Sequence, residues 1–145
     1  MTFKFSLATV LRVRQIVEEH EERVLKRISF EISEAVRAIE EVALEITEAD
    51  ASRISNRFEN SSGREIQRSY GLAEEIAQKK IECQGALVGL EERRSAQIAI
   101  YESARRDRET LTDMRGKKLV AYDGEMARRE QKLIDDNFIA RRGRR

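Results

Sequence analysis

Apolar residues recur at alternating spacings of three and four in the first third of the chain. The series occupies eight positions, which are Leu25, Ile28, Ile32, Ala35, Ile39, Val42, Ile46 and Ala49. This spacing draws one apolar stripe along a helix and lets the stripe pack against a second helix. The chain has no proline that would interrupt such a helix. The stripe therefore predicts a long helix in a coiled coil.

The same alternation continues toward the N-terminus after a change of register. The upstream positions are Val10, Val13, Val17, His20 and Val24. Two steps of four join Val24 to Ile28 and Ile32, which predicts a local relaxation of the supercoil. His20 on this stripe is interpreted as a register-setting or partly exposed residue, in preference to a metal ligand.

The helix is expected to begin near residue 7 and to end near residue 57. Ser6 is a suitable N-cap, and Phe5 and Val10 occupy the two positions of a hydrophobic staple. Phe3 and Phe5 are expected to anchor the entry of the chain into this helix.

One strong break separates this helix from a second. The sequence Asn-Ser-Ser-Gly at residues 60–63 predicts a turn over about 58–63, and Ser62 and Glu65 match a capping box. A second helix is expected over about 64–141. A kink in this helix is expected first at Gly85 to Gly89, because each glycine costs about 1 kcal/mol relative to alanine in a helix. Its weaker stripe contains Ile66, Tyr70, Ala73, Ile76, Cys83, Leu87, Leu90, Tyr101, Ala104, Leu111, Tyr122 and Leu133.

These elements predict an all-α fold, a long antiparallel two-helix coiled-coil hairpin forming a single domain over residues 1–145. The second helix is the longer one, so residues after about Gly116 are expected to extend past the N-terminus of the first helix. Phe58 and Phe138 are candidate partner contacts in this arrangement, with local packing as the alternative.

The composition argues against catalysis and against cofactor or metal binding. The chain has one cysteine, Cys83, and one histidine, so no intramolecular disulfide, CxxC site or histidine pair can form. A two-helix hairpin offers no concave pocket, and phosphate-loop, HExxH and GxSxG motifs are missing from the sequence. Cys83 is interpreted as a small core residue. The N-terminus lacks the apolar run of a signal peptide or membrane span, which favours a cytoplasmic protein without membrane insertion.

Nucleic-acid binding is also disfavoured, although the C-terminus is basic. Residues 105–145 hold 13 basic and 8 acidic side chains, but the whole chain carries a net charge of only +1. Asp135 and Asp136 interrupt the basic cluster, and no aromatic ladder accompanies it for stacking on bases. An acidic protein partner or a solvated helix end is therefore preferred.

Both ends of the chain resemble the flagellar FliJ family. The pattern F-x-F-x-L-x-x-V-L-x-x-R is present as Phe3, Phe5, Leu7, Val10, Leu11 and Arg14. The family's C-terminal pattern, with E-Q-K-x-x-D its most distinctive part, is similar to Tyr101, Leu111, Arg115, Tyr122, Glu125, Glu130, Gln131, Lys132 and Asp135. Asp136 replaces the glutamate that usually follows this aspartate, and the charge is kept.

The resemblance implies a non-catalytic component of the flagellar type III export machinery, built like the stalk subunit of rotary ATPases. Its termini are expected to enter a hexameric export ATPase and to promote its assembly, with contacts from Arg128, Arg129, Gln131, Lys132 and Asp135. The hairpin region is expected to contact the cytoplasmic domain of the export-gate membrane protein, near Val42, Leu72 and Ile76. Export chaperones are further expected partners, and the implied location is the cytoplasmic face of the cell membrane.

The residues alone also fit a generic cytoplasmic coiled-coil tether or scaffold. Such a protein would form a stable dimer with unrelated partners, whereas a stalk would be monomeric.

Overall fold

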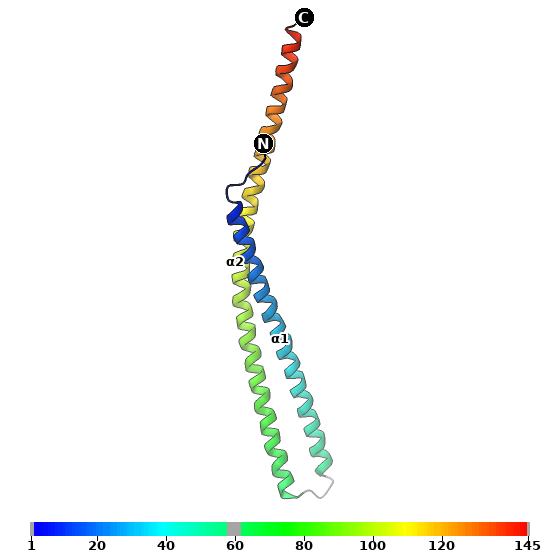
Figure 1. The fold of residues 1–145 in the computed structure, drawn as a ribbon. Helices are drawn as coiled ribbons and strands as arrows, with labels where there is room; N and C mark the ends of the chain where they lie inside the picture. Colours follow the sequence, from blue (N-terminus) through cyan, green and yellow to red (C-terminus); the bar gives the residue numbers. More distant parts are fainter. Residues whose placement is uncertain (1, 58–61, 145) are drawn as a thin grey trace. The chain divides into compact units, whose positions relative to one another are not determined.

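The computed structural model describes residues 2–57 and 62–144, with side chains described for residues 2–55 and 62–144. Within these ranges the regular structure consists of helix α1, Ala8–Arg57, and helix α2, Gly63–Arg142 (Figure 1). The described residues include no strand, which confirms the predicted all-α fold class. Residues 58–61 of the predicted turn, including Phe58, lie outside the described residues.

The two helices pack against each other in opposite directions, as a helical hairpin. The chain forms two compact units, one of Met1–His20 with Tyr101–Arg145 and the other of Glu21–Ile100. In the second unit Glu31 pairs with Arg93 at 3.4 Å and Glu45 pairs with Lys79 at 3.3 Å. Residue numbers rise on α1 as they fall on α2, so the helices are antiparallel.

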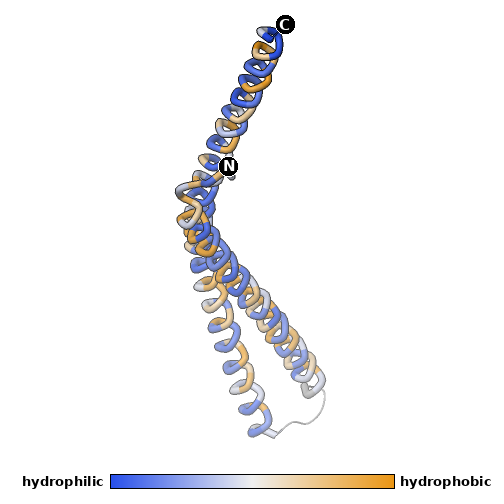
Figure 2. The backbone as a smooth tube through the Cα atoms, turned by 45° about the horizontal axis from the view of Figure 1, so that its top comes forward, coloured by the Kyte–Doolittle hydropathy of each residue, from blue (hydrophilic) through white to orange (hydrophobic). Residues whose placement is uncertain are grey.

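The core is a narrow seam between the helices. Six apolar side chains are buried among the described residues: Phe5, Leu11, Ile28, Val42, Ile76 and Ala104. Every predicted stripe residue of α1 from Leu25 to Ala49 is buried or half-buried, which confirms that part of the heptad. On α2 the predicted stripe is confirmed from Ala73 to Leu111, and it includes the half-buried Cys83. Figure 2 shows apolar and polar residues alternating along both helices.

Of the predicted stripe upstream of Leu25, only Val24 is half-buried, and the prediction is wrong for the other four residues. Val10, Val13, Val17 and His20 are exposed, and the seam runs instead through Leu11, Glu18 and Glu21. These three residues continue the heptad of Leu25 and Ile28 without interruption, so the predicted shift in register is absent. The valines are more apolar than the two glutamates, but each glutamate finds a polar partner on α2, described below.

The helix starts are only partly as predicted. At α2 the backbone amide of Ser62 donates a hydrogen bond to Oε2 of Glu65 at 3.3 Å, which is one half of the expected capping box. At α1 the first helical bond runs from the amide of Leu11 to the carbonyl of Leu7 at 2.9 Å, so Leu7 occupies the N-cap position in place of Ser6. Val10 is 43% exposed, and the staple expected between it and Phe5 is not formed.

The glycines of α2 have no packing role. The helix continues unbroken through Gly85 and Gly89, and a Cβ atom built on either residue would have no atom within 4 Å outside the local backbone. Each glycine therefore costs helix stability without a close approach that would require it.

Replacing Gly85 or Gly89 by alanine should stabilise the protein. Each change should raise the free energy of unfolding by about 1 kcal/mol, because alanine has less backbone entropy to lose and nothing obstructs its methyl group. Urea unfolding followed by circular dichroism at 222 nm would measure the effect. A lower free energy of unfolding in Gly85→Ala would contradict this assignment, and Ala86→Gly provides a matched control with the opposite sign.

Candidate partner-binding surface

A polar contact inside the seam sets the register of the two helices in the first unit. Nε of Arg108 donates a hydrogen bond to Oε2 of Glu18 at 2.6 Å, and a second guanidinium nitrogen donates to Oε1 at 3.1 Å. The side chains are only 25% and 16% exposed, respectively. A two-point contact between a guanidinium and a carboxylate fixes direction as well as distance. It therefore ties one turn of α1 to one turn of α2.

The same contact shifts both ionisation equilibria. The hydrogen bonds from Arg108 lower the pKa of Glu18, with attraction to Arg108 and Arg105 acting in the same direction against partial burial. The hydrogen bond to Glu18 in turn raises the pKa of Arg108. Both groups are thus held in their charged forms in the folded protein.

A second polar pair follows in the neighbouring unit. Gln97 is buried, and its side-chain amide donates hydrogen bonds to the carbonyl oxygen and to the carboxylate of Glu21. Burying an amide without partners would be costly, so this position on α2 requires Glu21 opposite it.

The residues before α1 fold back onto α2 and form what we call the N-terminal clasp, Phe3 and Phe5. The ring of Phe3 lies 5.6 Å from that of Tyr122, measured between centroids, at a tilted angle of 56°. Phe5 is buried, and the ammonium of Lys118 lies 5.5 Å from its ring centroid. These contacts confirm that Phe3 and Phe5 anchor the entry into the first helix.

α2 continues well beyond the clasp as what we call the terminal segment, residues 123–142. All described residues from Ala127 to Arg144 are exposed. Figure 1 shows this part of α2, in orange and red, running on past the start of α1. From Ala127 onward the segment is therefore free to contact a partner along all its sides.

All five residues predicted to contact an ATPase lie on the terminal segment. Arg128, Lys132 and Asp135 follow one another at intervals of four and three, so they share one face of the helix. Gln131 donates a hydrogen bond to Asp135 at 3.0 Å, and Arg129 forms an ion pair with Glu125 at 2.5 Å. The structure thus brings the predicted set together as one exposed, charged surface.

The residues predicted to contact an export gate are placed differently from one another. Val42 is 1% exposed and Ile76 is buried, so both side chains support the seam between the helices. Leu72 is 54% exposed on α2 in the same unit. Of these three residues, Leu72 alone presents its side chain to a partner in the folded hairpin.

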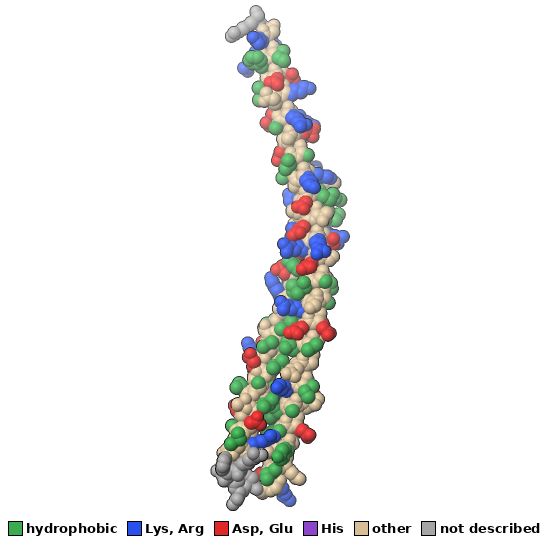
Figure 3. Space-filling model, turned by 180° about the vertical axis from the view of Figure 1, so that it is seen from behind, with side chains coloured by type: hydrophobic (Ala, Val, Ile, Leu, Met, Phe, Trp, Pro, Cys, Tyr) green, Lys and Arg blue, Asp and Glu red, His purple; other side chains and the backbone are tan. Residues whose placement is uncertain are grey.

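The structure exposes two apolar surfaces, of which only Phe138 was predicted from the sequence as a candidate partner contact. One is the stripe of Val10, Val13 and Val17 with the neighbouring Ile16, left exposed because the glutamates occupy the seam. The other is a second face of the terminal segment, whose exposed members are Leu133, Ile134 and Phe138. Figure 3 shows apolar side chains between charged ones along this part of the molecule. Ile134 and Phe138 are four residues apart in the sequence, and this spacing indicates an apolar pair on one side of a helix.

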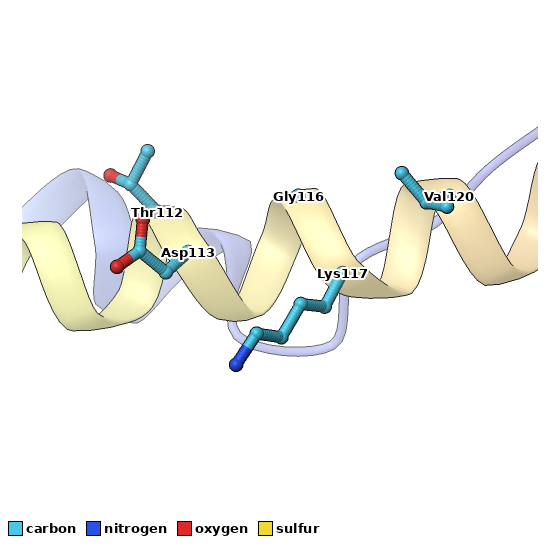
Figure 4. A pocket seen from close by; sticks show the side chains of 5 residues that line it. All are labelled: Thr112, Asp113, Gly116, Lys117 and Val120. Atoms are coloured by element: carbon cyan, nitrogen blue, oxygen red, sulfur yellow. The ribbon is translucent and has the colours of Figure 1, made fainter.

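A shallow hollow lies on the surface of the first unit at residues 112–120 of α2 (Figure 4). It is lined by Thr112, Asp113, Gly116, Lys117 and Val120, and it is largely open to solvent. The hollow exists because Gly116 has no side chain. It lacks the enclosure and the converging polar groups of a ligand site.

Within residues 2–57 and 62–144, no three His, Cys, Asp or Glu side chains meet in a way that would hold a metal ion. None of the described helices has the length and apolar character needed to cross a membrane. The chain matches no protein-family model, no curated protein and no solved structure.

Replacing Glu18 by glutamine should destabilise the hairpin in a pH-dependent way. The folded state lowers the pKa of Glu18, so the contact contributes stability at pH values above the ordinary glutamate pKa of about 4.3. That contribution is lost as the pH falls through the lower pKa of the folded state. Glu18→Gln should cost roughly 1–2 kcal/mol at pH 7, because Arg108 loses its charged partner in a partly buried site.

Urea unfolding at pH 7 and at pH 3 would measure this difference. The difference in the free energy of unfolding between wild type and Glu18→Gln should be smaller at pH 3 than at pH 7. The control variant Glu19→Gln changes an exposed neighbouring residue, and its free energy of unfolding should stay close to that of wild type at either pH. An equal loss at both pH values would refute the ionic origin of the effect.

Proposed function

We propose that this protein is a non-catalytic component of the bacterial flagellar protein export machinery, which binds a hexameric export ATPase and promotes its assembly and activity. The proposal takes its partner from the resemblance of both chain ends to the FliJ family. The helical hairpin is the fold that this resemblance implies. The observation that carries the proposal is the terminal segment, a helix exposed on all sides with Arg128, Lys132 and Asp135 on one face.

The charged face of Arg128, Lys132 and Asp135 is suited to orient a partner more than to supply binding free energy. Arg128 and Lys132 form no ion pair among the described residues, so their charges are available to a partner's carboxylates or carbonyl groups. Exposed charges of this kind speed association and select orientation, and they contribute modestly to the binding free energy. A helix that enters a ring needs such contacts on its outside.

The other end of the hairpin is proposed to contact the cytoplasmic domain of the export-gate protein. Leu72 is the exposed member of the expected contact set, and Tyr70, two residues earlier on α2, is also exposed. The guanidinium carbon of Arg53 on α1 lies 5.4 Å from the centroid of the Tyr70 ring. Arg53 also donates a hydrogen bond to the carbonyl oxygen of Ser69 at 3.2 Å. These two contacts hold this part of α2 in place. Escort of export chaperones and a location at the cytoplasmic face of the membrane complete the proposal.

A generic coiled-coil scaffold is the second candidate, and one observation favours it. Leu44, Ile81 and Val88 are large apolar residues that remain exposed within the unit of residues 21–100. Surfaces of this kind are often covered in an assembly. Light scattering separates the candidates, because a scaffold paired along this unit would remain dimeric at low micromolar concentration even without residues 129–145.

Replacing both Arg128 and Lys132 by alanine should reduce the stimulation of a flagellar export ATPase. Two exposed charge contacts are worth about 0.2–1 kcal/mol each, so the concentration of protein needed for half-maximal stimulation should rise roughly two- to thirtyfold. The loss should be largest at low ionic strength, where exposed charges are least screened. A phosphate-release assay on the purified ATPase measures this.

Two comparisons make this test decisive. The exposed Arg94→Ala lies on α2 away from the terminal segment and should leave stimulation unchanged. Deleting residues 129–145 should abolish stimulation while most of the helical signal in circular dichroism remains. Full-length protein that neither raises the hydrolysis rate nor promotes ring assembly would remove the proposal.

A further inference from the structure

The terminal segment presents two faces, and the proposed function uses only the charged one. Leu133, Ile134 and Phe138 lie on the side of the helix away from Lys132, and their side chains are 62%, 62% and 63% exposed. Three large apolar side chains within two turns of an otherwise solvated helix are costly to leave in water, at about 25 cal/mol for each Å² of apolar surface. This face therefore favours an apolar cover.

The apolar face continues the surface of α2 that already packs against a helix. Ala104, Arg108 and Leu111 face α1 in the first unit. Tyr122, Met126 and Leu133 follow at intervals of eleven, four and seven residues, which keep them on the same side of the helix, and Tyr122 and Met126 are still half-buried. Past Met126 the stripe runs on although every described residue is exposed. Leu133 thus continues the surface that packs against α1 where α1 no longer covers it, Ile134 and Phe138 widen that surface to one side, and a helix is its natural occupant.

Charge along the segment indicates which helix that is. Residues 123–138 contain five acidic and three basic side chains, whereas residues 139–145 contain four arginines and no acid. Glu130 and Arg141 both lie along the middle of the apolar face, because eleven residues make close to three full turns. Neither forms an ion pair with another described residue. An antiparallel copy of the segment would place acid against base at both ends.

We propose that the apolar face of the terminal segment pairs with the same face of a second copy of this chain, in antiparallel orientation. One register satisfies both kinds of contact. With Glu130 opposite the second copy's Arg141, Leu133 lies opposite Phe138 and Ile134 lies opposite Asn137. Two-fold symmetry repeats each contact, so two salt bridges flank a centre made of Leu133, Ile134, Asn137 and Phe138 from each copy.

We expect this dimer to be weak because its interface is small. A pairing of about twelve residues per copy buries less than the roughly 1,200 Å² of a stable interface, so a dissociation constant on the order of 10–100 µM is expected. The dimer does not depend on the proposed ATPase, but it uses the same segment. A partner that surrounds the segment would compete with the second copy.

Charge reversal in the full-length chain tests the pairing. Glu130→Arg and Arg141→Glu should each weaken dimerisation at least fivefold, because each turns both salt bridges into repulsive contacts. Mixing the two variants should restore dimers, since arginine then meets glutamate at both ends. Sedimentation velocity over a range from micromolar to several hundred micromolar measures the dissociation constants, and circular dichroism verifies that each variant remains helical.

Lys132→Glu is the matched control within the same segment. It lies on the opposite face and should leave the dimer unchanged, although it should impair stimulation of the ATPase under the proposed function. The two proposals can therefore fail separately. A wild-type chain that stays monomeric over the whole concentration range would overturn the pairing. So would a dimer indifferent to Glu130→Arg and Arg141→Glu, which would indicate another surface such as the exposed valines of α1.

Discussion

The contact between Glu18 and Arg108 decides which turn of α1 faces which turn of α2. Apolar side chains alone specify register poorly in a long heptad repeat, because a slip of seven residues preserves most of their packing. Such a slip would place Glu18 near Tyr101 or Arg115. Only the observed register also gives the buried Gln97 its partner Glu21. The two polar pairs together thus select one alignment, and this alignment brings Phe3 to Tyr122 and determines where the terminal segment begins.

The sequence predicted the parts of the hairpin in which local pattern and tertiary packing agree. Leu25 to Ala49 and Ala73 to Leu111 are apolar at the positions that pack, so periodicity alone located them. The pattern misled upstream, where valines repeat at heptad spacing but Glu18 and Glu21 occupy the seam. A glutamate becomes acceptable at such a position only through its partner on α2, far away in the chain. No local rule identifies that partner in advance.

The unequal lengths of the two predicted helices indicated the terminal segment. The residues predicted to contact the ATPase lie on its polar side. Its apolar side was harder to find. Glu130 and Arg141 stand among Leu133, Ile134 and Phe138, and they obscure the periodicity that marks an amphipathic helix. The structure separates the two sides because it shows how far each apolar side chain is exposed. The same helix can thus present charge to one partner and apolar surface to another.

The clasp has a kinetic consequence that follows from chain connectivity. Arg53 and Ser69 are 16 residues apart in the sequence, whereas Phe3 and Tyr122 are separated by more than a hundred residues. Closing a loop costs more entropy as the loop lengthens, so the helices zip together most readily from the connection between them toward the chain ends. The aromatic contact at Tyr122 is then the last to close and the first to fray. Opening of the hairpin therefore begins next to the terminal segment, the end of the molecule that we assign to binding.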